Sequence, residues 1–99
     1  MVVGILRLTL AIPAAQSLKE KRHAVKKLVD RVRARFNASI AEVAENDVWQ
    51  RAVLGVACVA NERAFVNEQL DKIVHEIERA AVADVVNREM EIQSLKDLY

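Results

Sequence analysis

The residues best able to do chemistry in this chain are cations gathered in one segment, residues 17–36. That segment carries eight cations and two carboxylates, so eight minus two gives it a charge of +6, while the whole chain has a net charge of only +1. Such asymmetry favours either a polyanionic partner or a helix face that stays in water. The eight cations are Lys19, Lys21, Arg22, Lys26, Lys27, Arg31, Arg33 and Arg35.

The first turn of this segment has the features of an anion site. Ser17 and Glu20 form a Ser-x-x-Glu capping box, which predicts that a helix begins there. Cations beside the exposed amides of a helix start can hold a phosphate group. We therefore predict an anion- and RNA-binding surface made of Lys19, Lys21, Arg22, Lys26 and Arg33. Since exposed cations contribute little to folding, reversing the charges of Lys21 and Arg22 should abolish binding and leave stability nearly unchanged.

Other chemistry finds little support in the sequence. His23 and His75 belong to different expected helices, and Cys58 lies inside an apolar run, so no metal site is expected. No Ser or Cys sits in a glycine-flanked elbow, and no glycine-rich phosphate loop is present. Gly4 and Gly55 are isolated glycines in expected strands, which indicates close backbone approach or a local twist. We expect no catalytic residues, no cofactor and no small-molecule substrate.

Hydrophobic periodicity predicts the elements that position the basic segment. Period-two alternation and apolar runs predict strands, while apolar residues three and four apart predict two helices, the second capped by Asn61. The expected strands cover residues 2–12, 38–45, 49–60 and 84–93. The order β-α-β-β-α-β, with two apolar and two polar strands, predicts an α+β ferredoxin-like sandwich. Its antiparallel sheet has strand order 4-1-3-2 and both helices on one face.

The same periodicities predict a core and an open sheet face. The helix stripes expected to pack on Leu6, Leu8 and Leu10 are Leu18, Val25, Leu28 and Val32, then Val66, Leu70, Ile73 and Ile77. The uncovered face of the sheet is expected to be a homodimer interface, with a bound peptide or RNA as the second choice. Its candidate residues are Val3, Ile5, Arg7, Trp49, Arg51 and Val53.

The aromatic residues restrict how RNA could bind. RNA-recognition motifs stack bases on aromatics in their two central strands, and this chain has only Phe36, Trp49, Phe65 and Tyr99. None of them lies in the middle of a central strand. Binding should therefore be led by phosphates and depend little on base identity.

Composition bounds the architecture and the setting. Ninety-nine residues with 53% hydrophobic content make one domain, assigned to residues 1–93 with a tail at 94–99. The single cysteine favours a reducing environment. The apolar start lacks a basic leader region and is interrupted by Arg7 and Thr9, and no run is long enough to cross a bilayer. We expect a cytoplasmic protein without a membrane partner.

Three segments together resemble the YlxP-like family of small bacterial proteins. They are Val-Val-Gly-Ile-Leu-Arg-Leu at 2–8, Ser-Leu-Lys-Glu-Lys-Arg at 17–22 and Asp-Val-Trp-Gln-Arg-Ala-Val-Leu-Gly-Val-Ala at 47–57, within a likeness that covers residues 2–92. The resemblance implies a ferredoxin-like domain of unknown function with no established catalytic residues. Genes of this family often lie beside the gene for ribosome-binding factor A, among genes for translation initiation and ribosome maturation. That neighbourhood implies a ribosome-associated or RNA-associated role.

These observations lead to one expectation and two alternatives. We expect a non-enzymatic accessory factor that binds ribosomal RNA or a ribosomal subunit through phosphates. The first alternative is a protein–protein or dimerisation module that uses the open sheet face and has no nucleic-acid role. The second is an enzyme whose site forms between subunits, which the lack of a paired nucleophile and base disfavours.

Overall fold

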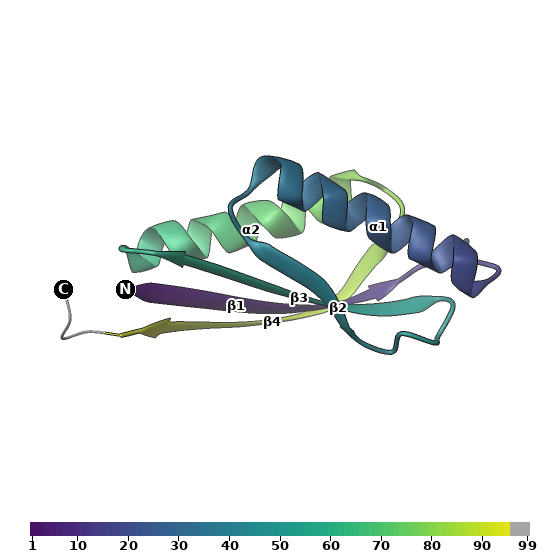
Figure 1. Ribbon diagram of the computed structural model, residues 1–99, viewed down its shortest axis with the longest axis horizontal. Coiled ribbons are helices and arrows are strands. Elements are labelled where there is room, and N and C mark those ends of the chain that lie inside the picture. Colours follow the sequence, from purple (N-terminus) through teal and green to yellow (C-terminus); the bar gives the residue numbers. More distant parts are fainter. Residues whose placement is uncertain (96–99) are drawn as a thin grey trace.

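The structure, a computed structural model that describes residues 1–95, has four strands and two helices (Figure 1). The strands are β1 (Val2–Ala11), β2 (Ser39–Ala44), β3 (Arg51–Ala60) and β4 (Asp84–Ser94), and the helices are α1 (Leu18–Arg35) and α2 (Arg63–Arg79). All strand pairs are antiparallel, in the order β2-β3-β1-β4, and both helices lie on one face of the sheet. The predicted ferredoxin-like fold and strand order are confirmed.

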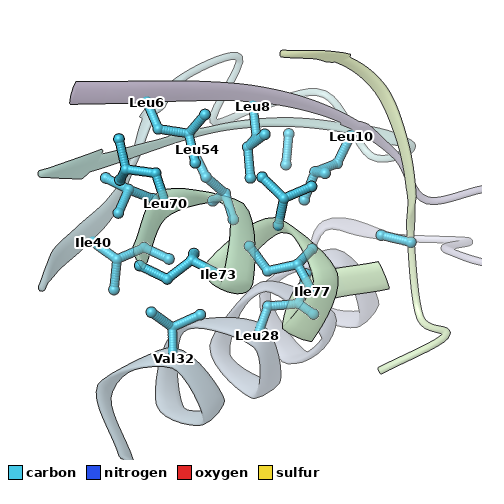
Figure 2. Packing of buried hydrophobic residues seen from close by; sticks show 14 of the residues in the cluster. Leu6, Leu8, Leu10, Leu28, Val32, Ile40, Leu54, Leu70, Ile73 and Ile77 are labelled. Atoms are coloured by element: carbon cyan, nitrogen blue, oxygen red, sulfur yellow. The ribbon is translucent and has the colours of Figure 1, made fainter. Parts of the chain in front are cut away.

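The core lies between the helices and the two central strands (Figure 2). In β1, alternate residues face the helices, and the register pairs Leu6 with Val56 and Leu8 with Leu54. The apolar stripe of each helix packs on this surface because residues three and four apart share one helix face. Of the expected core residues, only Leu18 is not fully buried, since it occupies the first position of α1.

Gly4 allows α2 to approach the sheet closely. A methyl group at this position would overlap Cγ1 of Val66 and lie 2.9 Å from Cδ1 of Leu70. The isolated glycine is therefore explained by close packing against a helix, which is one of the two explanations expected for a glycine in a strand.

Several boundaries differ from the expected ones. Trp49 and Gln50 lie in the β2–β3 loop and not in β3, and α2 begins after Glu62, whose side chain makes no capping hydrogen bond, so Asn61 is not its N-cap. Element ends are set by hydrogen bonds that a local pattern shows poorly.

Met1 and Leu95, the first and last residues that the structure describes, are bonded to each other at one end of the sheet. Ser94 ends β4, and the backbone N–H of Leu95 donates to the carbonyl of Met1 at 2.8 Å. The last strand therefore extends one residue beyond its expected end at residue 93. The rest of the expected tail, residues 96–99, lies outside the described residues. Across the described part of the chain, no helix is both long and apolar enough to cross a membrane.

Candidate nucleic-acid interface

The start of α1 is held by the predicted serine cap. The Ser17 Oγ atom accepts a hydrogen bond from the backbone N–H of Glu20 at 3.1 Å. The Glu20 carboxylate accepts from the backbone N–H of Gln16 at 3.4 Å instead of returning to Ser17. The cap therefore fixes where the helix begins. The position of the helix start in turn fixes the direction in which the side chain of each later cationic residue leaves the helix.

One face of α1 forms a basic wall along a groove of about 1100 Å³. Its cations recur at spacings of three and four residues, so their side chains leave the helix on the same side. The groove is also lined by residues 12–15 of the β1–α1 loop and by residues 81–84. The basic wall consists of Lys19, Arg22, His23, Lys26 and Lys27, all of them exposed.

Most charges on this wall have no internal partner. Within residues 1–95, no carboxylate lies within ion-pair distance of Lys19, Arg22 or Lys27, and Lys26 pairs with Asp30 at 2.6 Å. Of the carboxylates, Glu20 and Asp84 line the groove. Four permanent cations against these two carboxylates give the groove an excess of positive charge, arranged along about 12 Å of helix at the usual rise per residue. Such an array suits a ligand that carries several anionic groups in a row.

Lys21 does not belong to this surface, which corrects the expectation that it lies at the centre of the anion site. Its side chain is 0% exposed and points to the other side of α1, toward β2. The Nζ atom lies 2.7 Å from Oε2 of Glu42 and donates to the carbonyl of Glu45 at 2.6 Å. The reason is helical spacing, because Lys21 shares its face with the buried residues Val25 and Leu28.

Arg33 is also separate from the groove. It lies seven residues beyond Lys26, about 10 Å farther along the helix axis, and does not line the groove. Its guanidinium donates to the carbonyl of Ile40 at 3.2 Å. The predicted set of five residues thus divides: Lys19, Arg22 and Lys26 are brought together, whereas Lys21 and Arg33 have structural contacts elsewhere.

Two other cations of α1 bind the second helix. Arg31 and Arg35 contact the same carboxylate oxygen of Glu76, at 3.0 and 2.9 Å, and Glu76 is buried at the interface between the helices. Two cations of the +6 segment therefore serve the packing of α1 on α2. The unpaired charge that remains is concentrated toward the start of the helix, along the groove.

Sequence reasoning missed His23 and Lys27 as members of the groove. The spacing of four residues from Lys19 to His23 and from His23 to Lys27 places all three on one helix face. That signal was available in the sequence. The contribution of residues 81–84 was not, because they lie far away in the chain.

The open face of the sheet carries most of the expected interface residues. The register places five of the six on this face, and Trp49 is the exception because it lies in the β2–β3 loop. Val53 is nevertheless buried and Val3 is half-buried, so less apolar surface is exposed than expected. Ile5, at 44% exposure, is joined by Val43 and Val59 as the large apolar side chains exposed there. The five residues on the face are Val3, Ile5, Arg7, Arg51 and Val53.

A cross-strand ion pair lies at the centre of this face. Nε and Nη2 of Arg7 donate to the two carboxylate oxygens of Glu89 at 2.9 and 2.8 Å. This paired hydrogen bonding lowers the pKa of Glu89 and raises the pKa of Arg7. Both side chains are well exposed, so the pair contributes little to stability.

Side chains that could bind a metal are dispersed over the described part of the chain. Within residues 1–95, no group of three or more His, Cys, Asp or Glu side chains is placed to hold a metal ion. Cys58 is buried on the helix-facing side of β3, and desolvation raises the pKa of its thiol.

Comparison with solved structures shows the same fold. A de novo designed protein with ferredoxin fold matches 100% of this chain and 89% of its own, with a TM-score of 0.57 and 15% identity. A C-terminal segment of the alpha subunit of aIF2 from Pyrococcus abyssi matches 96% of this chain and 51% of its own, with a TM-score of 0.50 and 15% identity. At this level of identity, the likeness concerns the fold alone.

Sequence comparison finds a relative of higher identity. The chain is 36% identical over 73 residues to the uncharacterized protein YlxP of Bacillus subtilis (strain 168), a match that covers 74% of this chain and 79% of that protein. The model of the family described as protein of unknown function DUF503 matches residues 3–90, which include the whole of β1 beyond its first residue, both helices and most of β4. The chain therefore belongs to the DUF503 family, as its resemblance to YlxP-like proteins indicated.

Proposed function

We propose that this protein is a non-catalytic accessory factor that binds ribosomal RNA through the basic groove beside α1. The observation that supports the proposal is the placement of Lys19, Arg22 and Lys27 along one groove, without ion pairs to any other residue within positions 1–95. Lys26 adds a fourth positive charge, and its exposed pair with Asp30 can be exchanged for a phosphate at little cost.

The physical basis for choosing a nucleic acid is the number and spacing of the charges. A single small anion would contact one or two of the four cations, whereas a polynucleotide carries a phosphate at every nucleotide. Neutralising several phosphates at once releases condensed counterions, which supplies most of the affinity in contacts of this type. The choice of ribosomal RNA follows from the gene neighbourhood that the family resemblance implies.

Charge reversal in the groove provides the test. The variant Arg22→Glu with Lys26→Glu changes the net charge by four units at exposed positions that line the groove. A matched control, Lys72→Glu with Arg88→Glu, makes the same change at exposed positions outside the groove. Co-sedimentation with purified ribosomal subunits and binding of labelled ribosomal RNA should be measured for wild type and both variants over a salt series.

The expected result is loss of binding in the groove variant and retention in the control, with equal thermal stability for all three proteins. For wild type, the logarithm of the binding constant should fall linearly with the logarithm of the salt concentration. The slope should be roughly −0.7 to −0.9 for each phosphate neutralised. Equal affinity of the groove variant and the control would contradict the proposed site. Absence of wild-type binding at low salt would contradict RNA binding altogether.

A second function, self-association through the open sheet face, is supported by a separate observation. Ile5, Val43 and Val59 are large apolar side chains exposed on one surface that neither helix covers. A two-fold homodimer would bury them against their own copies. Sedimentation equilibrium should then show a dimer for wild type and a monomer for Ile5→Asp. A wild-type protein that stays monomeric at high concentration would remove this alternative.

A further inference from the structure

The only tryptophan of the chain is displayed at the surface. Trp49 is 53% exposed and lies in the β2–β3 loop, where Val48 is exposed beside it. A tryptophan side chain is usually well buried, because its large apolar surface is costly to hydrate. Exposure of this ring therefore indicates that it takes part in binding.

The loop that carries Trp49 is held at both ends. At its start, the Glu45 carbonyl accepts hydrogen bonds from Nζ of Lys21 at 2.6 Å and from the backbone N–H of Val48 at 3.1 Å. At its end, Arg51 forms an ion pair with the Glu45 carboxylate at 2.7 Å. The ring is thus presented by an ordered loop, so little conformational entropy remains to be lost when a ligand stacks on it.

The same loop is bonded to residues of the β1–α1 loop that line the basic groove. Nε2 of Gln50, the residue after Trp49, donates to the carbonyls of Pro13 and Ala15 at 3.2 and 3.1 Å. The Gln50 carbonyl in turn accepts from the backbone N–H of Ile12 at 2.9 Å. All three partners line the groove. Figure 1 shows the β2–β3 loop and the start of α1 at the same end of the molecule.

We propose that Trp49 stacks on an unpaired base of an RNA strand whose phosphates lie in the groove beside α1. This inference rests on the proposed function and specifies its ligand as single-stranded RNA or an RNA loop. Bases of a regular duplex are already stacked inside the helix, whereas unpaired bases can turn outward onto an aromatic side chain. The expectation against base stacking concerned the sheet, whose central strands lack aromatics, whereas Trp49 lies in the loop between β2 and β3.

Charge decides between RNA and a protein as the occupant of this end of the molecule. An exposed tryptophan also suits a protein interface, where aromatic residues are enriched. The loop that carries Trp49 is, however, bonded to residues of a groove that presents Lys19, Arg22, Lys26 and Lys27, and lysine is depleted from protein interfaces. An aromatic platform beside a row of cations is the combination that binds single strands.

Intrinsic fluorescence makes the test direct, because Trp49 is the only tryptophan and its emission reports on its own environment. Wild type, Trp49→Ala and Trp49→Phe should be titrated with a short single-stranded oligoadenylate and with an RNA duplex of equal charge. Tryptophan emission measures stacking in wild type. The anisotropy of a dye on the RNA measures total binding in all three proteins, and the groove variant Arg22→Glu with Lys26→Glu is included as the phosphate control.

We expect the oligoadenylate to quench Trp49 emission and the duplex to leave it almost unchanged. Trp49→Ala should weaken oligoadenylate binding by roughly fivefold or more, since a single stacked base contributes at least that much, while Trp49→Phe should retain most of the affinity. Duplex binding should be the same for all three proteins.

Two results would overturn the inference in different ways. Salt-dependent RNA binding that is lost in the groove variant but is unaffected by Trp49→Ala, without quenching, would keep the phosphate site and refute stacking. Failure of wild type to bind either RNA would refute the proposed function, and the stacking inference with it.

Discussion

Replacing Lys21 with methionine should destabilise the protein by about 3 kcal/mol, although this lysine lies in a strongly cationic segment. Its ammonium is fully buried, 2.7 Å from Oε2 of Glu42, and it also donates to the Glu45 carbonyl. Methionine keeps most of the methylene packing but leaves the Glu42 carboxylate, which is only 15% exposed, without its charge partner.

The magnitude follows from the burial of the two groups. Removing one member of a buried ion pair typically costs about 3–5 kcal/mol, because the remaining charge is desolvated without compensation. Partial access of water to Glu42 places the expected value at the lower end of that range. For a domain of this size, 1 kcal/mol shifts the melting temperature by about 4–8 °C, so the melting temperature should fall by roughly 12–24 °C.

Urea unfolding followed by circular dichroism is the assay, with Lys19→Met as the matched control. Lys19 lies on the exposed face of the same helix, so its replacement should change the free energy of unfolding by less than about 0.5 kcal/mol. The double variant Lys21→Met with Glu42→Leu should recover most of the loss, because both buried charges are then removed. If Lys21→Met is no less stable than Lys19→Met, the buried ion pair does not support the fold and the reasoning is refuted.

The buried ion pair also changes how charge reversal at Lys21 must be interpreted. A glutamate at this position would place a second carboxylate beside Glu42 in a buried site, where like charges repel strongly. The expectation that reversing Lys21 leaves stability unchanged is therefore corrected. Loss of RNA binding in such a variant would report unfolding, so Arg22 and Lys26 are the positions to reverse.

Three further predictions concern the core. Gly4→Ala should destabilise by about 1–3 kcal/mol, because its methyl group would overlap Val66, and the added change Val66→Ala should relieve that clash in thermal melts. Leu28→Ala should cost about 2–5 kcal/mol in urea unfolding, because Leu28 is fully buried in the core, and a cost near zero would contradict the packing of α1 on the sheet. Cys58, buried and with a raised pKa, should be alkylated by iodoacetamide much more slowly in the native protein than in urea, and equal rates would contradict its burial.

The fold could be predicted from the sequence because its signals are local. Alternation in strands and three-to-four spacing in helices depend on side-chain direction over a few residues, and both periods are clear in this chain. Strand order followed from polarity, since the two apolar strands, β1 and β3, had to be central and the two polar strands, β2 and β4, had to be at the edges. The glycine in β1 was likewise a correct sign of close packing.

The site could be predicted only in part, and Lys21 shows why. Its spacing from Val25 and Leu28 places it on the buried stripe, but a lysine there is tolerated only if a buried partner exists. That partner, Glu42, comes from β2, and it faces the helices because the register pairs it with Leu54. A partner 21 positions away is identified only once the sheet has formed.

The groove and its aromatic neighbour depend on tertiary structure for the same reason. The stripe from Lys19 to Lys27 is a local feature of one helix, and the sequence was sufficient to place those cations together. The other residues that line the groove, 12–15 and 81–84, and the loop that carries Trp49 come from three other segments of the chain. Formation of the antiparallel sheet brings them to one end of the molecule. Strand pairing joins residues that are far apart in the chain, and no local periodicity in the sequence reveals which residues will pair.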